Sequence, residues 1–216
     1  MCVKINTKKL STFFRTRHAE HKGTPQDKQN FTLLMQAIRD SIDAYGEKIK
    51  YKFLLTAALG AAPSNMENIE WDKVKDILDL MNIMSYDYNG VWSPDANHNS
   101  PLYEPASPAG WGGSLDASFT RLTQQYKVPP EKICVGVAFY GRSLLMKDME
   151  SCKLYSTEHL KKTDTITFAV DEGQPQYFNI LLQKHKFTEM WDDTSKVPYL
   201  IGNPGKNRYT IRILRR

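Results

Sequence analysis

The sequence lacks any apolar run long enough to cross a membrane. Its longest candidate, residues 53–62 (FLLTAALGAA), has the length of a strand, whereas a membrane helix needs about 20 consecutive apolar residues. The first residues, MCVKINTKKLSTFF, also lack the apolar core of a secretory signal. The sequence therefore predicts no membrane partner and, as written, no export route, so we expect a cytoplasmic chain.

Cysteine is also scarce. Cys2, Cys134 and Cys152 form neither a CxxC pair nor a zinc-like pattern with histidine, which argues against a disulfide scaffold and a zinc module. Cys134 lies in KICVGVAF, where we expect a small buried side chain. The HxxH spacing of His18 and His21 is compatible with a metal on a helix, but nothing else supports it. No metal or cofactor is predicted.

The net charge of +5 is unevenly distributed. Residues 1–22 hold six basic side chains and one acidic, and residues 206–216 hold five basic and no acidic ones. The remaining 18 basic and 23 acidic residues give residues 23–205 a net charge of −5. A basic tail can bind nucleic acid, but these ends have no recognition motif and little aromatic interleaving, so the sequence favours solvated, disordered ends.

Between these ends, 41% apolar and 25% charged residues indicate a globular chain. Thr24 and Pro25 predict the start of an amphipathic helix that Gly46 ends, with Phe31, Leu34, Met35, Ile38, Ile42 and Tyr45 on its buried face. Further on, helices and apolar strands alternate. Strands are expected at residues 51–58, 81–86 and 132–139, and helices at residues 71–80 and 114–126, the latter capped by Ser114. This order predicts a parallel sheet covered by helices, an α/β fold.

Two kinds of parallel sheet fit that alternation. A doubly wound nucleotide-binding sheet requires a glycine-rich phosphate turn after a strand, and LGAAPSN at residues 59–65 lacks the GxGxxG spacing. A β/α barrel gathers its chemistry at the carboxyl ends of several strands, and here those ends carry Tyr86-Asp87 and Tyr140-Gly141-Arg142. The barrel explains more, and the irregular sequence beyond Arg142 indicates a small α+β region.

The stretch LMNIMSYDY, residues 80–88, is the most informative part of the chain. Side chains alternate along a strand, so Met84 and Tyr86 share one side and Asp87 faces the other unless the strand bends. An acid that ends a buried strand is rarely needed for packing. The sequence leaves two readings of Asp87 open, a functional carboxylate or a cap of the turn at Asn89-Gly90.

Four strings carry a family resemblance. In chain order they are MNIMSYDYNG (81–90), HNSPLY (98–103), KICVGVAFYGRS (132–143) and EMWDDTSKVPYL (189–200). Together they resemble family eighteen glycoside hydrolases, the chitinases, of the bacterial type with an α+β insertion before the last barrel strand. Residues 23–46 resemble the family's helix after its fourth strand. The resemblance extends from about Gly23 to about Gly205 and implies an extracellular, secreted relative.

The resemblance implies substrate-assisted hydrolysis of β-1,4-linked N-acetylglucosamine polymers, an exception to the two-carboxylate scheme of most glycosidases. Asp87 matches the acid at the end of the sixth strand, and Tyr86 matches the phenol that holds the substrate's acetamido group. Met84 would pack beside that group. Tyr140 and Arg142 match the pair from the seventh strand that binds the sugar, although a plain surface arginine is the other reading of Arg142.

Some site residues have a structural reading of equal weight. Sugars present apolar faces on which Trp92, Trp111 or Tyr140 could stack, while ordinary packing explains either tryptophan as well. His98 is either a substrate-binding residue, through its HNSPLY context, or a hydrogen-bonded loop histidine. Trp71 and Trp191 are expected to be structural.

The sequence departs from the family in one decisive respect. The family's fourth-strand signature DxxDxDxE, whose Glu donates the proton, is expected upstream of residue 23, where the chain reads NTKKLSTFFRTRHAEHK. The last barrel strand also has no match. We therefore expect a partial (β/α)8 barrel of roughly strands five to seven in residues 23–143, an α+β insertion in residues 144–205, and unmatched basic segments in residues 1–22 and 206–216.

The functional expectation follows from that departure. The sequence predicts a chitinase truncated at both ends, inactive by itself, that binds chitin or chitooligosaccharides and associates with itself through exposed barrel edges. The alternative is a non-catalytic protein that binds chitin or a partner. A nucleic-acid binder with basic tails is a weaker third reading, and we expect no nucleic-acid partner.

Overall fold

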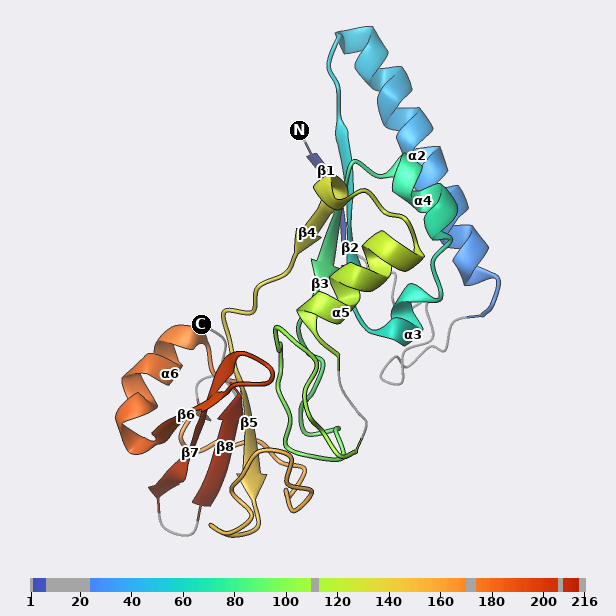
Figure 1. Ribbon diagram of the computed structural model, residues 1–216. Coiled ribbons are helices and arrows are strands. Elements are labelled where there is room, and N and C mark those ends of the chain that lie inside the picture. The colour runs from blue at the N-terminus through green and yellow to red at the C-terminus, as the bar shows by residue number, and fades with distance from the viewer. Residues whose placement is uncertain (1, 7–23, 110–112, 170–173, 206–207, 214–216) are drawn as a thin grey trace. The chain divides into compact units, whose positions relative to one another are not determined.

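A computed structural model describes residues 2–6, 24–109, 113–169, 174–205 and 208–213 (Figure 1). The chain divides into two compact units. The first comprises Met1–Met84 and Ser118–Gly136, and the second comprises Ser85–Ala117 and Val137–Arg216. No described helix combines the length and the hydropathy that a membrane span requires.

The first unit is built on a four-stranded sheet in the order β1-β2-β3-β4, in which every neighbouring pair is parallel. Its strands are β1 (Cys2–Asn6), β2 (Leu54–Gly60), β3 (Leu80–Met84) and β4 (Ile133–Val135). Helices separate them along the chain, as the sequence predicts for an α/β fold. The described residues form no closed barrel, because β1 and β4 are the outer strands of this sheet.

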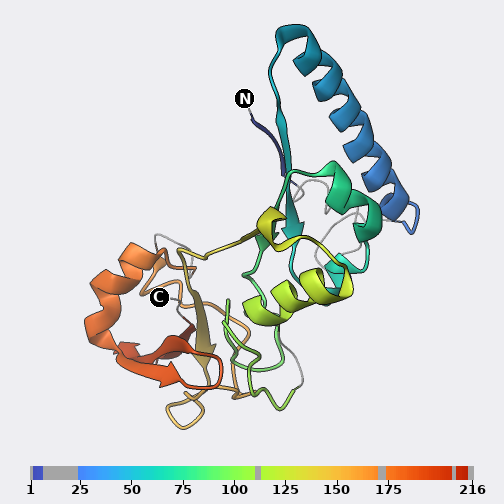
Figure 2. The same cartoon turned by 45° about the horizontal axis from the view of Figure 1, so that its top comes forward.

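Five helical segments belong to the connections between these strands. They are α2 (Asp27–Ile49), α3 (Pro63–Met66), α4 (Trp71–Ile77), α5 (Leu115–Thr120) with a π-helical turn at Arg121–Gln125, and a 3-10 turn at Pro130–Lys132. Helices α2 and α4 lie side by side (Figure 2). Ser114 Oγ accepts a hydrogen bond from the Ala117 amide at 3.0 Å, the capping contact expected there.

Helix α2 differs from its prediction at both ends. It begins at Asp27, whose carboxylate accepts the Thr24 amide at 2.6 Å. It continues past Gly46 and ends at Ile49, and Lys50 after it adopts a left-handed φ of 54°. Gly46 serves a different purpose, because a Cβ there would lie 2.3 Å from the Tyr51 carbonyl oxygen. The glycine lets the chain that leaves the helix pass close to it.

The apolar face of α2 is only partly covered. Phe31 and Met35 are buried, whereas Leu34 and Tyr45 are exposed. The remaining core of the unit comes mainly from β2, β3 and α4, where Leu55, Ala57, Leu59, Val74, Ile77, Met81 and Ile83 are buried. Trp71 is structural, as expected. It is buried, stacks on Tyr126 and donates its indole hydrogen to the Met66 carbonyl at 2.8 Å.

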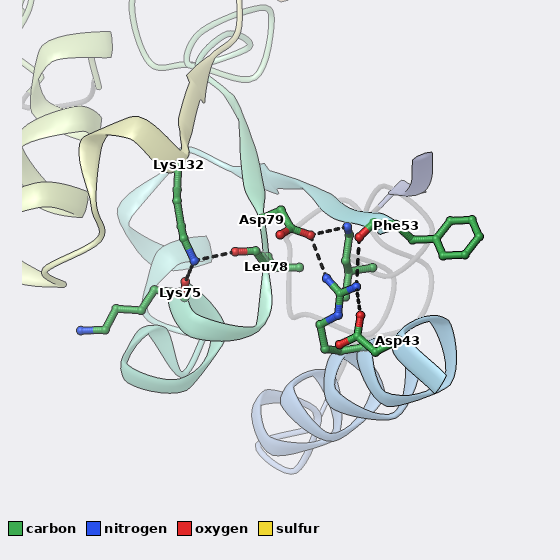
Figure 3. A network of polar contacts seen from close by, with 8 residues as sticks. Asp43, Phe53, Lys75, Leu78, Asp79 and Lys132 are labelled. Carbon is green, nitrogen blue, oxygen red and sulfur yellow. Dashed lines mark hydrogen bonds and ion pairs between the residues drawn. The ribbon is translucent and has the colours of Figure 1, made fainter. Parts of the chain in front are cut away.

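A network of hydrogen bonds and ion pairs joins the amino ends of β2 and β3 to α2 (Figure 3). Asp79, just before β3, accepts the Leu55 amide of β2 at 2.7 Å and Arg39 Nη1 of α2 at 2.8 Å. Arg39 Nη2 also donates to Asp43 and to the Phe53 carbonyl. These contacts lie at the end of the sheet opposite to the strand ends that carry the predicted site, so they serve stability.

Lys132, the residue before β4, attaches this strand to α4. Its ammonium group donates to the carbonyl oxygens of Lys75 and Leu78, at 2.7 and 2.9 Å, at the carboxyl end of α4 (Figure 3). A cation at a helix carboxyl end satisfies carbonyl groups that have no partner within the helix.

The second unit contains a four-stranded antiparallel sheet in the order β5-β8-β7-β6. Its strands are β5 (Arg142–Met146), β6 (Thr188–Asp192), β7 (Val197–Gly205) and β8 (Arg208–Ile213), with the helix α6 (Tyr177–Gln183) and a 3-10 turn at Lys184–Lys186. Ile180 of α6 packs on Leu200 of β7. This is the α+β arrangement expected beyond Arg142.

The prediction of disordered basic ends is wrong for residues 2–6 and 208–213. Residues 2–6 form β1, which pairs with β2, and β8 lies inside its sheet between β5 and β7. The alternation in RYTIRI is typical of a strand, and Ile211 is buried. The basic charge of these segments does not reveal this alternation.

The expectation of a buried Cys134 is also wrong. Cys134 and Val135 are exposed on β4, because this strand is an outer strand of the parallel sheet. Cys152 is buried among Ala96, Leu144, Met146 and Ile211 in the second unit.

Candidate active site

The chain bends directly after β3, where the sequence places Tyr86 and Asp87. The strand ends at Met84, and Asp87 adopts a left-handed backbone conformation with a φ of 62°. Among residues other than glycine, Asp and Asn tolerate this region best. The simple alternation of side chains therefore stops before Tyr86, and the direction of Asp87 is set by its contacts in the second unit.

The Asp87 carboxylate is the centre of a hydrogen-bonded cluster. Its Oδ1 accepts the Tyr140 hydroxyl at 2.5 Å, Arg142 Nη2 at 2.6 Å and Arg142 Nε at 3.2 Å. Among the described residues these three hydrogen bonds to the carboxylate all end on Oδ1. The side chains of Asp87 and Arg142 are 32% and 12% exposed. Asp87 is therefore engaged with this pair of residues, and Arg142 is not a plain surface arginine.

The two tyrosines of the cluster are held as hydrogen-bond donors. Burial raises the pKa of Tyr140 well above its ordinary value, and its hydrogen bond to Asp87 raises it further. Burial and the negative charge of Asp87 likewise raise the pKa of Tyr86. The two rings meet edge to face, with centroids 6.1 Å apart. At neutral pH both phenols keep their protons.

Trp92 takes part in this cluster through Arg142. The Arg142 guanidinium carbon lies 4.8 Å from the centroid of the Trp92 ring and 5.7 Å from that of Tyr140, a cation–π arrangement. Gly90 allows the tryptophan to take this position, because a Cβ at residue 90 would lie 2.6 Å from the indole ring. The structure thus brings together Tyr86, Asp87, Trp92, Tyr140 and Arg142.

The described contacts of this cluster do not include the other predicted site residues. Met84 is the last residue of β3 and belongs to the first unit. Trp111 lies outside the described residues, as do His18 and His21. Trp191, expected to be structural, is half-exposed on β6.

His98 is completely buried, and its Nε2 lies 2.7 Å from Asp192 Oδ2. This contact fits the interpretation of His98 as a hydrogen-bonded loop histidine, and the substrate-binding interpretation stays a prediction.

Asp192 is the residue of this region that the sequence did not single out. It accepts the Tyr155 hydroxyl at 2.9 Å in addition to His98. Burial opposes its charge, but the hydrogen bonds from His98 and Tyr155 prevail and hold the pKa of Asp192 well below its ordinary value. Burial also raises the pKa of Tyr155 to about 12. The hydrogen bond between Asp192 and His98 therefore attaches the loop after β3 to β6.

That loop is polar and nevertheless buried. Eight of its polar residues are at most 2% exposed: Ser85, Asn89, Ser93, Asp95, Asn97, His98, Asn99 and Ser100. Buried polar groups are costly unless they are hydrogen-bonded. A dense run of Asn, Ser and Asp beside the predicted acid was the available signal that this loop is a structured part of the site.

Among the described residues no three His, Cys, Asp or Glu side chains come together as a metal-binding group. The chemistry available at the cluster is that of a carboxylate, two phenol donors and a guanidinium. Such a group can stabilise a positive charge and donate hydrogen bonds to a carbonyl oxygen.

The fold and the cluster define an α/β protein with a hydrogen-bonded carboxylate site. Comparison with known proteins identifies its family. The family described as Glycosyl hydrolases family 18 matches residues 12–210. The chain belongs to this family, and the resemblance inferred from the four sequence strings is confirmed.

Similarity to individual proteins supports the same family assignment. Chitinase A1 from Niallia circulans is 36% identical over 200 residues, which cover 84% of this chain and 27% of that protein. A family 18 N-acetylglucosaminidase from Paenibacillus barengoltzii has a similar structure, with a TM-score of 0.79 at 25% identity over 99% of this chain and 58% of that chain. Chitinase ChiA74 from Bacillus thuringiensis gives a TM-score of 0.78 at 27% identity, covering 100% of this chain and 35% of that one. The chain thus spans less than two thirds of each.

Proposed function

We propose that the second unit carries part of a chitinase active site, for the hydrolysis of β-1,4-linked N-acetylglucosamine polymers. In this proposal Asp87 is the carboxylate that stabilises the cation formed from the substrate's acetamido group, and Tyr86 donates to the acetamido oxygen. Tyr140 and Arg142 bind the sugar and orient Asp87. Family membership and the names of the relatives support the substrate class.

One observation carries the assignment. Asp87 combines a left-handed backbone with three hydrogen bonds on one carboxylate oxygen, from two side chains that lie 53 and 55 positions further along the chain. A carboxylate that only capped the turn after β3 would not need a tyrosine and an arginine from a distant segment.

The first prediction concerns binding. Asp87→Ala is expected to weaken binding of an N-acetylglucosamine tetramer at least tenfold, because it removes the acceptor and leaves the Arg142 charge without its partner. Isothermal titration calorimetry of the 216-residue chain measures this effect. Asp193→Ala, which removes an exposed carboxylate on the turn after β6, is the matched control and should bind as the parent does. Equal affinity of the Asp87→Ala variant and the parent would overturn the proposal.

The proposal includes a limit on catalysis. The 216 residues contain no DxxDxDxE sequence, so this chain by itself has no counterpart of the family's proton donor. Binding of chitooligosaccharides without hydrolysis, the alternative function, is the behaviour that this combination supports.

We further propose that β2, β3 and β4 correspond to strands five to seven of a (β/α)8 barrel. The parallel order, the helices between the strands and the similarity to part of longer family 18 structures support this correspondence. In that case β4 faces solvent where a further strand would pair, and its exposed Val135 is available to another chain.

The second prediction follows from that outer strand. The chain is expected to associate with itself as its concentration rises, and Val135→Lys should shift it toward the monomer, because a lysine on an outer strand opposes pairing with another chain. Size-exclusion chromatography with light scattering over a range of concentrations measures the shift. Leu33→Lys, on the exposed face of α2, controls for added charge. A parent chain that stays monomeric and unfolds in one sharp transition would contradict the prediction.

A further inference from the structure

Asn99 holds the residue that bears the site carboxylate. Its side-chain Oδ1 accepts the backbone amide of Asp87 at 3.0 Å, and its backbone carbonyl accepts the amide of Tyr88 at 3.0 Å. Asn99 is 2% exposed, so water does not compete for these contacts. Both bonds act on the backbone where the chain turns after β3.

The neighbours of Asn99 extend this contact on both sides. Ser100 Oγ donates to the Ser85 carbonyl at 2.5 Å, and Asn89 Nδ2 donates to the His98 carbonyl at 2.9 Å. Residues 98–100 thus run along residues 85–89 and bind them at four points. We call these two segments the 85–100 clasp. Because Asp192 binds His98, the clasp is also attached to β6.

A contact to the Asp87 amide is needed because Asp87 has a disfavoured backbone. Its φ of 62° places it in the left-handed region, which reduces the population of a non-glycine residue about fivefold to 150-fold relative to its ordinary conformations. Such a conformation persists only where neighbouring contacts enforce it. If φ became negative, the carboxylate would leave the Tyr140 hydroxyl and the Arg142 guanidinium.

We propose that Asn99 is a positioning residue for Asp87: it fixes the left-handed backbone that presents the carboxylate to Tyr140 and Arg142. In the described cluster the hydrogen bonds of Tyr140 and Arg142 end on Asp87 and not on Asn99, so Asn99 acts through the Asp87 backbone. The functional importance of this role rests on the proposed function, whereas the backbone geometry can be tested without it.

The variants separate positioning from general stability. Leucine is similar in size to asparagine, so Asn99→Leu removes the acceptor with little change in volume. Asn99→Asp keeps an oxygen for the Asp87 amide. Ser100→Ala removes a neighbouring bond of the clasp that does not touch Asp87, and is the matched control. Asn99→Ser, whose short hydroxyl does not reach the Asp87 amide, carries the same test if the leucine variant does not fold.

The decisive measurement is made by NMR without ligand. A positive φ brings the amide proton and Hα of one residue close together, so Asp87 should give a strong intraresidue amide–Hα NOE in the parent chain. We expect that NOE to be lost in Asn99→Leu, and kept in Asn99→Asp and Ser100→Ala. An unchanged Asp87 NOE in Asn99→Leu and Asn99→Ser would overturn the proposal, as would its loss in Ser100→Ala.

Binding of the N-acetylglucosamine tetramer gives the functional measurement. Asn99→Leu should weaken binding about tenfold or more, as Asp87→Ala does, while Asn99→Asp and Ser100→Ala stay within about threefold of the parent. If the parent does not bind the tetramer, the proposed function fails and the NOE decides the positioning role alone. If Asp87→Ala weakens binding and Asn99→Leu does not, the positioning role fails and the proposed function stands.

Discussion

Hydrolysis of chitooligosaccharides by the purified 216-residue chain is expected to stay at background. Protonation by a general acid typically supplies about 10²- to 10⁴-fold in rate, and the 216 residues contain no DxxDxDxE sequence to supply the family's proton donor. Asp87 cannot serve as both donor and stabiliser. Its carboxylate accepts the hydrogen bonds of Tyr140 and Arg142, whereas a proton donor must itself carry a proton.

A fluorogenic chitobioside assay measures the rate of hydrolysis, with an active family 18 enzyme as the positive control. Asp87→Asn should leave the background rate unchanged if the chain does not catalyse hydrolysis. Robust release of chitobiose that Asp87→Asn abolishes would contradict the prediction. It would also assign the acid to another carboxyl group, for example Glu104, which is exposed in the loop after β3.

Asp192→Ala is expected to destabilise the chain by about 3 kcal/mol or more, because it removes the acceptor of the buried imidazole of His98 and of the partly buried hydroxyl of Tyr155. The Asp192 side chain is 9% exposed, so solvent does not replace the lost contacts. Chemical denaturation monitored by circular dichroism measures the change. Asp193→Ala removes the adjacent, largely exposed carboxylate and should have little effect. Similar stability losses in the two variants would contradict the role of the buried group.

The same carboxylate should make stability depend on pH. The pKa of Asp192 in the folded chain lies below its ordinary value of 3.8, so its contribution is fully present above that value and is lost as the pH falls toward the lowered folded pKa. Between about pH 4 and pH 2, the parent chain should therefore lose stability faster than Asp192→Ala. Parallel decreases in the two proteins would show that other groups cause the acid sensitivity.

The sequence predicted the cluster because its members belong to strings that resemble one family and lie at the ends of apolar segments. Tyr86, Asp87, Tyr140 and Arg142 meet as the resemblance implied. The alternation of helices and strands was also readable, since periodicity reports local structure well. The bounds were less accurate, as Gly46 shows, because a close approach by Tyr51 and a helix end both call for glycine.

The contacts of the polar loop after β3 could not be predicted from the sequence. His98 and Asp192 are 94 positions apart, and neither periodicity nor composition pairs two polar residues across that distance. Asn99 was overlooked for a related reason: its role depends on the backbone angle of Asp87, which no local pattern encodes. The strands β1 and β8 were missed because their basic charge resembled that of a solvated tail.

The exposed thiol of Cys134 on β4 provides a means of observing this outer strand in solution. Of the two free cysteines described, Cys134 is exposed and Cys152 is buried, so a maleimide dye attached in a Cys2→Ser background would label β4 selectively. Its emission would change when another polypeptide covers that strand. The same label would serve in a screen for peptides that pair with β4, independently of any enzymatic assay.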